Sequence, residues 1–494
     1  MTEGPESART QPEEPSDRAA AARQVPDWAI IALACIGQFM VILDVSIVNV
    51  ALPSIQHSLG YSESGLQWVV TAYTLTFAGF LLLGGRLADL YGRRRIFIGG
   101  LLLFTLASLA CGLADTPALL IAGRAAQGLA GAALAPATLT LLTTTFPSGP
   151  RRARAIGIWS GVMGAGGAVG SLAGGLLTDF LSWRWIFLVN IPVGIAAVVV
   201  ASLILTEQTR ERASSKLDVA GAVTVTAGLA LFVFAIGETE TGGMLSRDML
   251  LPLLIALGLL AGFVLIEARV ASHPLLPLNV FRIRSVSVAN LAAMLMGSAL
   301  FGFWFLSTLY MQNVLGFTPL ETGLAFVPHS LAIVAGSQIT ARLLSRFGNR
   351  AMMLSGLALA IVGFFAHAQL NVTADYFPHV FVPGVLVAFG MGLVIAPMTG
   401  AATEGVGPER SGLVSGLLNT SRQMGGSLGL GLLATVAAIR SSTALASDPG
   451  AVAQALSSGY TSAYAVGGAI LIAAFAVSLM IPRHERAARE PVAR

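Results

Sequence analysis

Long hydrophobic stretches separated by short polar loops dominate the pattern of this 494-residue chain. Fourteen of these stretches are roughly 18–28 residues long, and about 20 apolar residues suffice for a helix to cross a hydrocarbon core of ~30 Å. Because lipid offers no partner to backbone polar groups, such stretches are expected to be helices. The pattern therefore predicts an all-α polytopic membrane protein whose spans lie near 28–53, 66–85, 96–114, 117–143, 155–178, 185–205, 217–236, 249–266, 285–311, 321–341, 351–369, 377–400, 411–439 and 460–481.

Positive charges fall on alternate sides of these predicted spans. Of the 29 Lys and Arg residues, 24 lie in the two tails and in the loops that follow even-numbered spans. The opposite loops hold only Arg184, Arg247 and Arg440, whereas Arg124 and Arg422 lie inside spans. Loops rich in Lys and Arg stay in the cytoplasm. We therefore expect a multi-pass protein of the plasma membrane with both termini in the cytoplasm.

An internal repeat indicates how the spans are grouped. The loop GRLADLYGRR at 85–94 aligns without gaps with ARLLSRFGNR at 341–350. The repeat predicts one six-helix bundle at 28–206 and a second at 285–482, with two inserted spans and cytosolic linkers at 207–284. Two related bundles around a membrane-normal axis favour a transporter with its substrate site between them, near mid-membrane.

Composition and charge exclude several other classes of protein. The segment at 1–27 is polar and acidic and predicts a disordered cytosolic tail, and 483–494 is expected to be a second cytosolic tail. The net charge of +4 follows from topology and does not indicate nucleic-acid binding. Cys35 and Cys111 lie within spans and are expected to be small apolar packing residues, not a disulfide or a metal site. There is no Gly-rich GK[ST] loop for an ATP-driven enzyme.

Several motifs together resemble the major facilitator superfamily, and in particular its fourteen-span drug:proton antiporter branch. They are GRLADLYGRRR (85–95), ILDVSIVNVALPSI (42–55), RAAQGLAGAALAPA (124–137), GVMGAGGAVGSLAGGLL (161–177), WRWIFLVNIPVG (183–194) and GLLNTSRQMGGSLG (416–429). The resemblance covers 28–482. It implies a pair of six-helix bundles plus two inserted helices. It also implies proton-coupled export of drugs, antibiotics or other hydrophobic small molecules by alternating access, with no enzyme activity and no cofactor beyond the proton-motive force.

Asp44 is the acidic residue that lies deep inside a predicted span. An unpaired carboxylate at the centre of a membrane helix costs about 2.5–3.5 kcal/mol, so Asp44 is expected to face the protein interior and to pair or to bind a proton. Arg124 lies at a comparable depth, ~10 Å from the outer end of its span against ~14 Å for Asp44, so a direct or water-mediated pair is feasible. Gln127, Gly128 and Gly131 share the face of Arg124, where another helix can approach closely.

For Asp44 and Arg124 the resemblance implies a role in proton coupling. The alternative for Asp44 is a structural carboxylate that pins the first span, and the alternative for Arg124 is a helix-packing clamp. The cytoplasmic signature loop is implied to be a conformational latch formed by Gly85, Arg86, Asp89, Gly92, Arg93 and Arg94. The simpler interpretation of this loop is a topology anchor, and in the second copy Ser345 stands at the position of Asp89.

The fifth span carries a stripe of glycines. Gly166, Gly170 and Gly174 recur at every fourth residue and predict a smooth face for helix contact. The resemblance assigns Gly161, Gly166, Gly170, Gly174 and Gly175 to an antiporter motif, although generic close packing explains the glycines equally well. The family pattern has Gly-Pro where this chain has Gly170-Ser171, which weakens that assignment.

Polar and amphipathic residues on the central spans are candidates to line a substrate cavity. These candidates are Gln38, Asn49, Trp68, Tyr73, Gln127, Tyr310, Gln312, Asn419, Arg422 and Gln423. Arg422 either contacts an acidic or polar substrate or caps backbone carbonyls near a broken helix. The expected partners are a small-molecule substrate, protons and the lipid bilayer, without nucleic acid, and we expect a monomer. Two rival functions remain: a proton-coupled metabolite symporter, and a lipid or glycolipid translocase.

Overall fold

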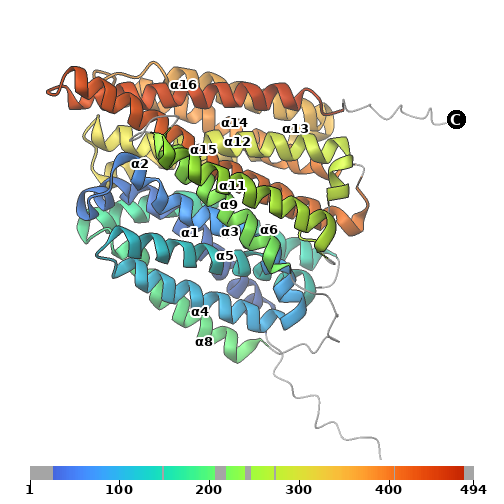
Figure 1. Ribbon diagram of the computed structural model, residues 1–494. Helices are drawn as coiled ribbons and strands as arrows, with labels where there is room; N and C mark the ends of the chain where they lie inside the picture. Colours follow the sequence, from blue (N-terminus) through green and yellow to red (C-terminus); the bar gives the residue numbers. More distant parts are fainter. Residues whose placement is uncertain are drawn as a thin grey trace, which may run out of the picture.

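The computed structural model describes residues 26–146, 149–205, 218–239, 246–271, 274–276, 278–404 and 406–482. Within these ranges every regular element is a helix, and the long helices run side by side along one direction (Figure 1). The predicted tail at 1–27 is described only at its last two residues. The tail at 483–494 and parts of the linkers within 207–284 lie outside the described residues.

The chain begins with the helices α1 (Asp27–Leu59), α2 (Glu63–Leu66), α3 (Trp68–Tyr91), α4 (Arg93–Gly112), α5 (Pro117–Thr145), α6 (Pro150–Phe180), α7 (Trp185–Leu188) and α8 (Asn190–Ile204). Its middle part holds α9 (Val219–Gly237) and α11 (Arg247–Leu265), which continues as the π-helix η2 (Ile266–Val270). The remainder holds η3 (Leu278–Arg282), α12 (Arg284–Asn313), α13 (Pro319–His367), η4 (Tyr376–Val380), α14 (Phe381–Thr403), α15 (Pro408–Ser447) and α16 (Val452–Ser478).

The described residues contain 13 helices that are long and apolar enough to cross a membrane. One of them, α13, has 49 residues and bends at Gly348, whose φ of 77° and ψ of 168° are not helical. Its two legs match the two predicted spans at 321–341 and 351–369. Each of the fourteen predicted spans therefore has a helix, and the predicted all-α fold class is confirmed.

The bend in α13 matches the internal repeat. Gly348 is the counterpart of Gly92, which separates α3 from α4 and has a φ of 92°. Positive φ at both positions requires glycine, because a Cβ disfavours this part of the backbone map. The repeated loop thus redirects the chain at the same point in both copies.

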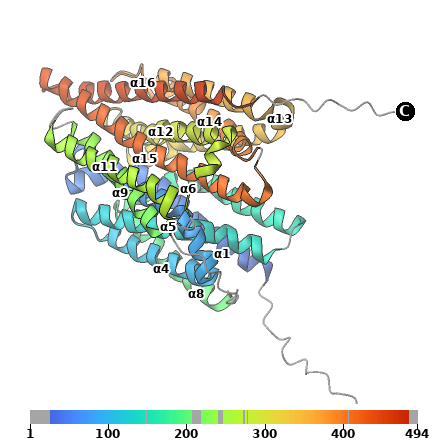
Figure 2. The ribbon, with the colours of Figure 1, turned by 45° about the vertical axis from the view of Figure 1, so that its right-hand side comes forward.

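Packing links the helices in two groups with contacts between them (Figures 1 and 2). In the first, α1 packs on α6, α3 on α5, and α4 on α5 and α8. In the second, α12 packs on α15 and α16, and α13 on α14. The groups meet where α6 contacts α13, α3 contacts α15 and α1 contacts α12, while α9 pairs with α11 and touches α3 and α15.

The ends of the last two helices differ from the sequence prediction. α15 continues to Ser447, eight residues beyond the predicted span, so Arg440 lies within a helix and not in a loop. α16 begins at Val452, well before the predicted start at 460. Hydropathy locates the part of a helix that crosses lipid, whereas the hydrogen-bonded helix continues into polar sequence beyond it.

Candidate functional site

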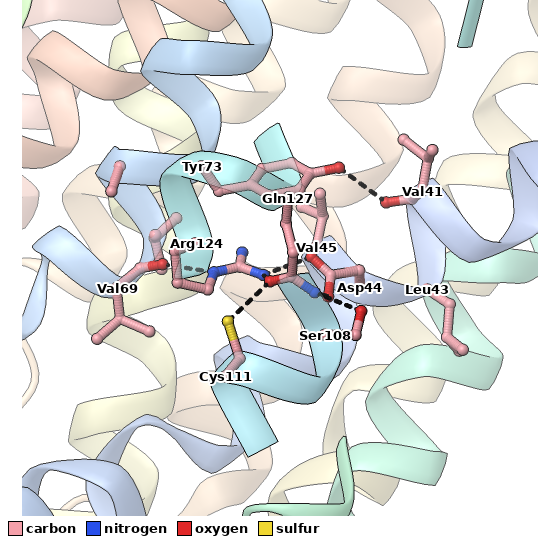
Figure 3. A network of polar contacts seen from close by, with 12 residues as sticks. Val41, Leu43, Asp44, Val45, Val69, Tyr73, Ser108, Cys111, Arg124 and Gln127 are labelled. Carbon is pink, nitrogen blue, oxygen red and sulfur yellow. Dashed lines mark hydrogen bonds and ion pairs between the residues drawn. The ribbon is translucent and has the colours of Figure 1, made fainter. Parts of the chain in front are cut away.

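The predicted pairing of Asp44 and Arg124 is present. The carboxylate on α1 is 0% exposed and the guanidinium on α5 is 1% exposed, and Arg124 Nη1 donates a hydrogen bond to Asp44 Oδ2 (Figure 3). A buried charge of either sign would be costly alone, so each residue stabilises the other in the interior. The pair joins α1 to α5 across the N-terminal group of helices.

Local sequence features place Arg124 at this depth. Thr116 caps the start of α5 by accepting a hydrogen bond from Leu119 N at 3.3 Å, and Pro117 occupies the first helical turn. Gly128 allows α3 to approach α5, because a Cβ at this position would overlap Thr76 Oγ1 and the Tyr73 carbonyl. The predicted close approach along the Arg124 face is therefore observed, and it brings α3 against the guanidinium.

Residues of α3 complete the surroundings of Arg124. Its Nε donates to the carbonyl oxygen of Val69 at 2.8 Å. The ring of Tyr73 lies 4.5 Å from the guanidinium carbon, at a distance suited to a cation–π interaction. The centroid of the Phe187 ring, from α7, lies 5.7 Å from the same guanidinium carbon. The cation is thus held by aromatic faces as well as by hydrogen bonds.

Gln127 connects the ion pair to α4 and uses its whole amide group to do so. Its Nε2 donates to Asp44 Oδ1 at 3.0 Å and to Ser108 Oγ at 2.8 Å. Its Oε1 accepts from Arg124 Nη1 at 2.8 Å and from Cys111 Sγ at 3.4 Å. These four contacts fix the orientation of the amide, and both oxygens of Asp44 have a donor. Gln127 therefore belongs to this network.

Sequence reasoning missed Ser108 and Cys111 as members of this network. Cys111 was expected to be a small packing residue, yet its thiol donates to Gln127 (Figure 3). The two side chains lie three residues apart on one face of α4, which is the spacing of neighbours on a helix. A small polar pair at that spacing inside an apolar span was the available signal.

A cavity of about 130 Å³ lies in the other group of helices, between α12, α14 and α15. Its lining residues are Ala293, Met296, Ile395, Met398, Thr399, Ser415, Leu418, Asn419 and Arg422. Arg422 is half-buried and its Nη2 donates to Asn419 Oδ1 at 2.8 Å. Both residues were predicted to line a cavity, and both are among the polar residues of this lining. A second cavity, of about 550 Å³, lies between α1, α5 and α6 and contains the Asp27–Arg151 pair, whose oxygen and nitrogen are 3.8 Å apart.

The other predicted cavity residues line neither of these two cavities. Tyr73 packs on Arg124, and Gln38 accepts a hydrogen bond from Thr138 Oγ1 at 3.2 Å. Asn49 Nδ2 donates to the Val45 carbonyl of its own helix at 2.9 Å. Polar side chains in helices often satisfy themselves on nearby backbone carbonyls, and helical periodicity alone does not reveal this.

Three more of these predicted cavity residues, Tyr310, Gln312 and Trp68, make contacts that link helices or loops. Tyr310 donates to the Asn371 carbonyl at 2.7 Å, and Gln312 Nε2 donates to the Val50 carbonyl at 2.8 Å, which ties α12 to α1. Trp68 packs against a small hydrophobic cluster that includes residues of α9 and α11. Gln423 lines neither cavity and is half-buried.

The glycine stripe of the fifth span places α6 against α1 and α13. A Cβ at Gly170 would overlap Ser46 Oγ, and one at Gly174 would lie 2.6 Å from the Ile47 carbonyl oxygen. On another side of the helix, a Cβ at Gly175 would lie 2.6 Å from the Pro319 carbonyl oxygen. Gly166 also contacts α1, but at Gly161 no described atom lies within 4 Å of a Cβ. Gly161 therefore takes no part in this packing.

The signature loop lies at the junction of α3 and α4. Arg86 Nη2 donates to the Pro274 carbonyl at 2.7 Å, and Arg94 Nη2 donates to the Ser202 carbonyl at 3.0 Å. Arg93 also has a contact partner. Asp89 lies in α3, and its side chain lies outside the described part of the chain. Next to this loop, α3 approaches α5 closely at Gly84, where a Cβ would overlap the Ala132 carbonyl.

Comparison with known proteins identifies the family of this chain. The sequence model of the protein family described as Major Facilitator Superfamily matches residues 34–430 of this chain. The chain is 45% identical to the cephamycin export protein CmcT of Amycolatopsis lactamdurans over 82% of its length and 84% of that protein. It is 40% identical to the puromycin resistance protein pur8 of Streptomyces alboniger over 94% of both chains.

Solved structures agree at the level of the fold. A bacterial homologue of the human lysosomal transporter Spinster, in an inward-facing and occupied conformation, superposes with a TM-score of 0.68 at 16% identity. The match covers 92% of this chain and 96% of that structure. Within the described residues, no group of three or more His, Cys, Asp or Glu side chains could hold a metal ion. The chain is a multi-pass membrane transporter, not an enzyme, and it belongs to the Major Facilitator Superfamily.

Proposed function

We propose that this protein exports antibiotics, drugs or other hydrophobic small molecules across the plasma membrane in exchange for protons. Export is supported by its similarity to the cephamycin export protein and the puromycin resistance protein. The observation that carries proton coupling is the fully buried Asp44–Arg124 pair, which lies apart from the described cavities.

The pair provides a switch between two charge states. When Asp44 is ionised, it neutralises Arg124 and holds α1 against α5. A proton on Asp44 removes the negative charge, so Arg124 becomes an uncompensated cation in a low-dielectric interior. That state favours rearrangement of α1 and α5 until the cation is solvated or paired again. Binding of a proton to Asp44 is thereby coupled to a movement of α1 and α5.

Alternating access is supported by where the two groups of helices contact each other and by where the cavity with Arg422 lies. Close contacts between the two groups of helices include the Gln312–Val50 hydrogen bond and the approach of Gly175 to Pro319, and both lie at ends that the charge pattern predicts to be extracellular. The cavity that holds Arg422 lies toward the ends predicted to be cytoplasmic. We infer that this conformation is closed to the outside. During transport, the helices at 28–206 and those at 285–482 rock as two bundles around the site.

The remaining residues take supporting roles in this proposal. Gly85, Arg86, Asp89, Gly92, Arg93 and Arg94 form the cytoplasmic latch. The glycines of α6 provide a surface on which α1 and α13 slide, because no side chain there interlocks with its neighbours. Both termini lie in the cytoplasm, and a monomer contains all of these parts.

The experiment is transport in inverted membrane vesicles with an imposed proton gradient. Vesicles with the unchanged protein are expected to accumulate puromycin and to release protons from their lumen. Asp44→Asn is expected to abolish this accumulation while the protein still inserts. The matched control is Asp115→Asn, which removes an exposed carboxylate just before α5 and is expected to transport normally.

Other outcomes would favour the rival functions. Proton-driven release of solute from the vesicles, in place of uptake, would indicate a symporter. Movement of lipid without movement of any water-soluble compound would indicate a translocase. Full accumulation by Asp44→Asn would refute the coupling role of this carboxylate.

A further inference from the structure

A second pair of buried acids lies outside the site described above, on the two inserted helices. Asp218, at the start of α9, is 8% exposed, and Glu267, in η2 at the end of α11, is 5% exposed. One oxygen of each carboxyl group accepts a backbone hydrogen bond. Gly221 N donates to Asp218 Oδ1 at 2.8 Å, and Leu276 N donates to Glu267 Oε2 at 3.0 Å.

The other two oxygens of these acids lie close to one another. Asp218 Oδ2 and Glu267 Oε1 are buried, and neither has a hydrogen-bond donor among the described residues. The two side chains lie within hydrogen-bonding reach of one another. Both oxygens also lie beside Gly221: a Cβ built on this glycine would be 2.6 Å from Asp218 Oδ2 and 3.0 Å from Glu267 Oε1.

Two carboxyl groups in this arrangement need a proton between them. Two ionised carboxylates are both acceptors and repel each other, whereas an acid beside a carboxylate supplies the missing donor. Among the described side chains of the adjoining elements, three cations are exposed or have a contact of their own. Arg86 of α3 donates a hydrogen bond from Nη2 to the Pro274 carbonyl, and Arg422 of α15 donates one to Asn419. Arg269 of η2 is exposed.

Glu267 also binds a short piece of chain, residues 274–276, which we call the strap. Its Leu276 N is bound by Glu267, and its Pro274 carbonyl is bound by Arg86 of the signature loop. Between them, Leu275 is buried in a cluster with Leu83 of α3 and Ala222 of α9. The strap therefore connects the acid pair with the cytoplasmic end of α3.

We propose that Asp218 and Glu267 form a second proton-binding site, which holds one shared proton and thereby keeps the strap docked on the end of α3. Loss of that proton leaves two negative charges in contact, and Glu267 moves away from Asp218. The strap moves with Glu267 and leaves Leu83. The inserted helices thus act on the signature loop, through a site that works independently of Asp44.

The first test measures access to the strap. Leu275→Cys places a thiol in the buried cluster, and Asp248→Cys provides an exposed reference for the intrinsic pH dependence of maleimide labelling. The labelling rate of Leu275→Cys relative to that reference is expected to rise severalfold as the pH increases. Adding Glu267→Gln is expected to keep the rate low at all pH values, because the amide still accepts from Leu276 N and donates to Asp218 without titrating.

A flat relative rate in the protein with both native acids would overturn the proposal, and so would an equal rise in the Glu267→Gln protein. A second test leaves the strap unaltered. Infrared difference spectra of the purified protein across pH are expected to show one carboxylic acid C=O band that is absent from Glu267→Gln. The band is expected to remain in Asp44→Asn and Asp248→Asn. A band that disappears only with Asp44→Asn would place the proton in the first site and refute the second one.

Discussion

The two groups of helices divide charge and space between them. In the N-terminal group, the Asp44–Arg124 pair is completely buried, and the amide of Gln127 uses each of its hydrogen-bonding positions on neighbouring groups. In the C-terminal group, Arg422 has an amide partner instead of a carboxylate and borders a cavity. The two related groups of helices therefore differ in what they contain: the first holds a buried ion pair, and the second holds a cavity.

This difference indicates how one scaffold can serve two ligands. A saturated network has no room for a drug but responds strongly to a single proton, because each member depends on its neighbours. A cavity lined by Met, Ala, Ile and Leu together with a few polar side chains is suited to amphipathic molecules and is expected to respond weakly to protons. Changes in the two groups are therefore expected to differ in kind as well as in size.

The largest effect is expected from Arg124→Ala. The change leaves Asp44 buried without its cation, and breaking a buried pair in this way costs ~3–5 kcal/mol. Thermal unfolding in detergent is expected to occur at a clearly lower temperature, and proton-driven efflux is expected to be lost. The matched change in the other group, Arg422→Ala, breaks no ion pair within the part of the chain that the structure describes, and it is expected to leave the unfolding temperature nearly unchanged. Equal destabilisation by both changes would remove the contrast between the groups.

The next effect concerns the packing of α6. Gly170→Ala places a Cβ on Ser46 Oγ and near the Leu43 carbonyl, so overpacking is expected to cost ~1–3 kcal/mol. Gly161→Ala is the matched control on the same helix, because it gains the same helix propensity without any described atom within 4 Å. The measurement is the difference in unfolding temperature between the two variants. Similar temperatures would show that α1 and α6 do not depend on this contact.

A smaller effect is expected from Arg422→Ala on transport. Loss of the charged side chain from the cavity lining is expected to raise KM for a transported drug about three- to tenfold, or ~0.6–1.4 kcal/mol. The dependence of transport on the proton gradient is expected to remain, since the Asp44 network is untouched. Arg422→Lys keeps the charge and is expected to recover part of the affinity. An altered pH dependence with an unchanged KM would assign Arg422 to coupling.

The span positions and the Asp44–Arg124 pair could be predicted from the sequence, and the reason is physical. Lipid penalises any unpaired charge, so a buried Asp and a buried Arg at similar depths have few alternatives to pairing. The close approach at Gly128 was predictable for a similar reason, because a glycine on the face of a membrane helix permits close packing.

The cavity could not be predicted in the same way. Uncharged side chains such as Asn49, Gln312 and Tyr310 have many possible partners, and in the structure they bond to backbone carbonyls. The acid pair at Asp218 and Glu267 was missed because both residues lie at the ends of predicted spans, where charge is ordinary. Hydropathy locates helices but does not determine which way their polar residues turn.

The smallest effect is expected at Cys111, at the edge of the N-terminal network. Cys111→Ala removes one donor from Gln127 Oε1, which still accepts from Arg124, so the loss is expected to be near the lower end of ~0.5–1.5 kcal/mol. Cys111→Ser keeps a donor at the same position and is expected to restore stability. Cys35→Ala is the matched control, because this cysteine borders a cavity and lies outside the network. If Cys111→Ala and Cys35→Ala have the same unfolding temperature and pH profile of transport, the network does not include the thiol of Cys111, which then serves only to fill space.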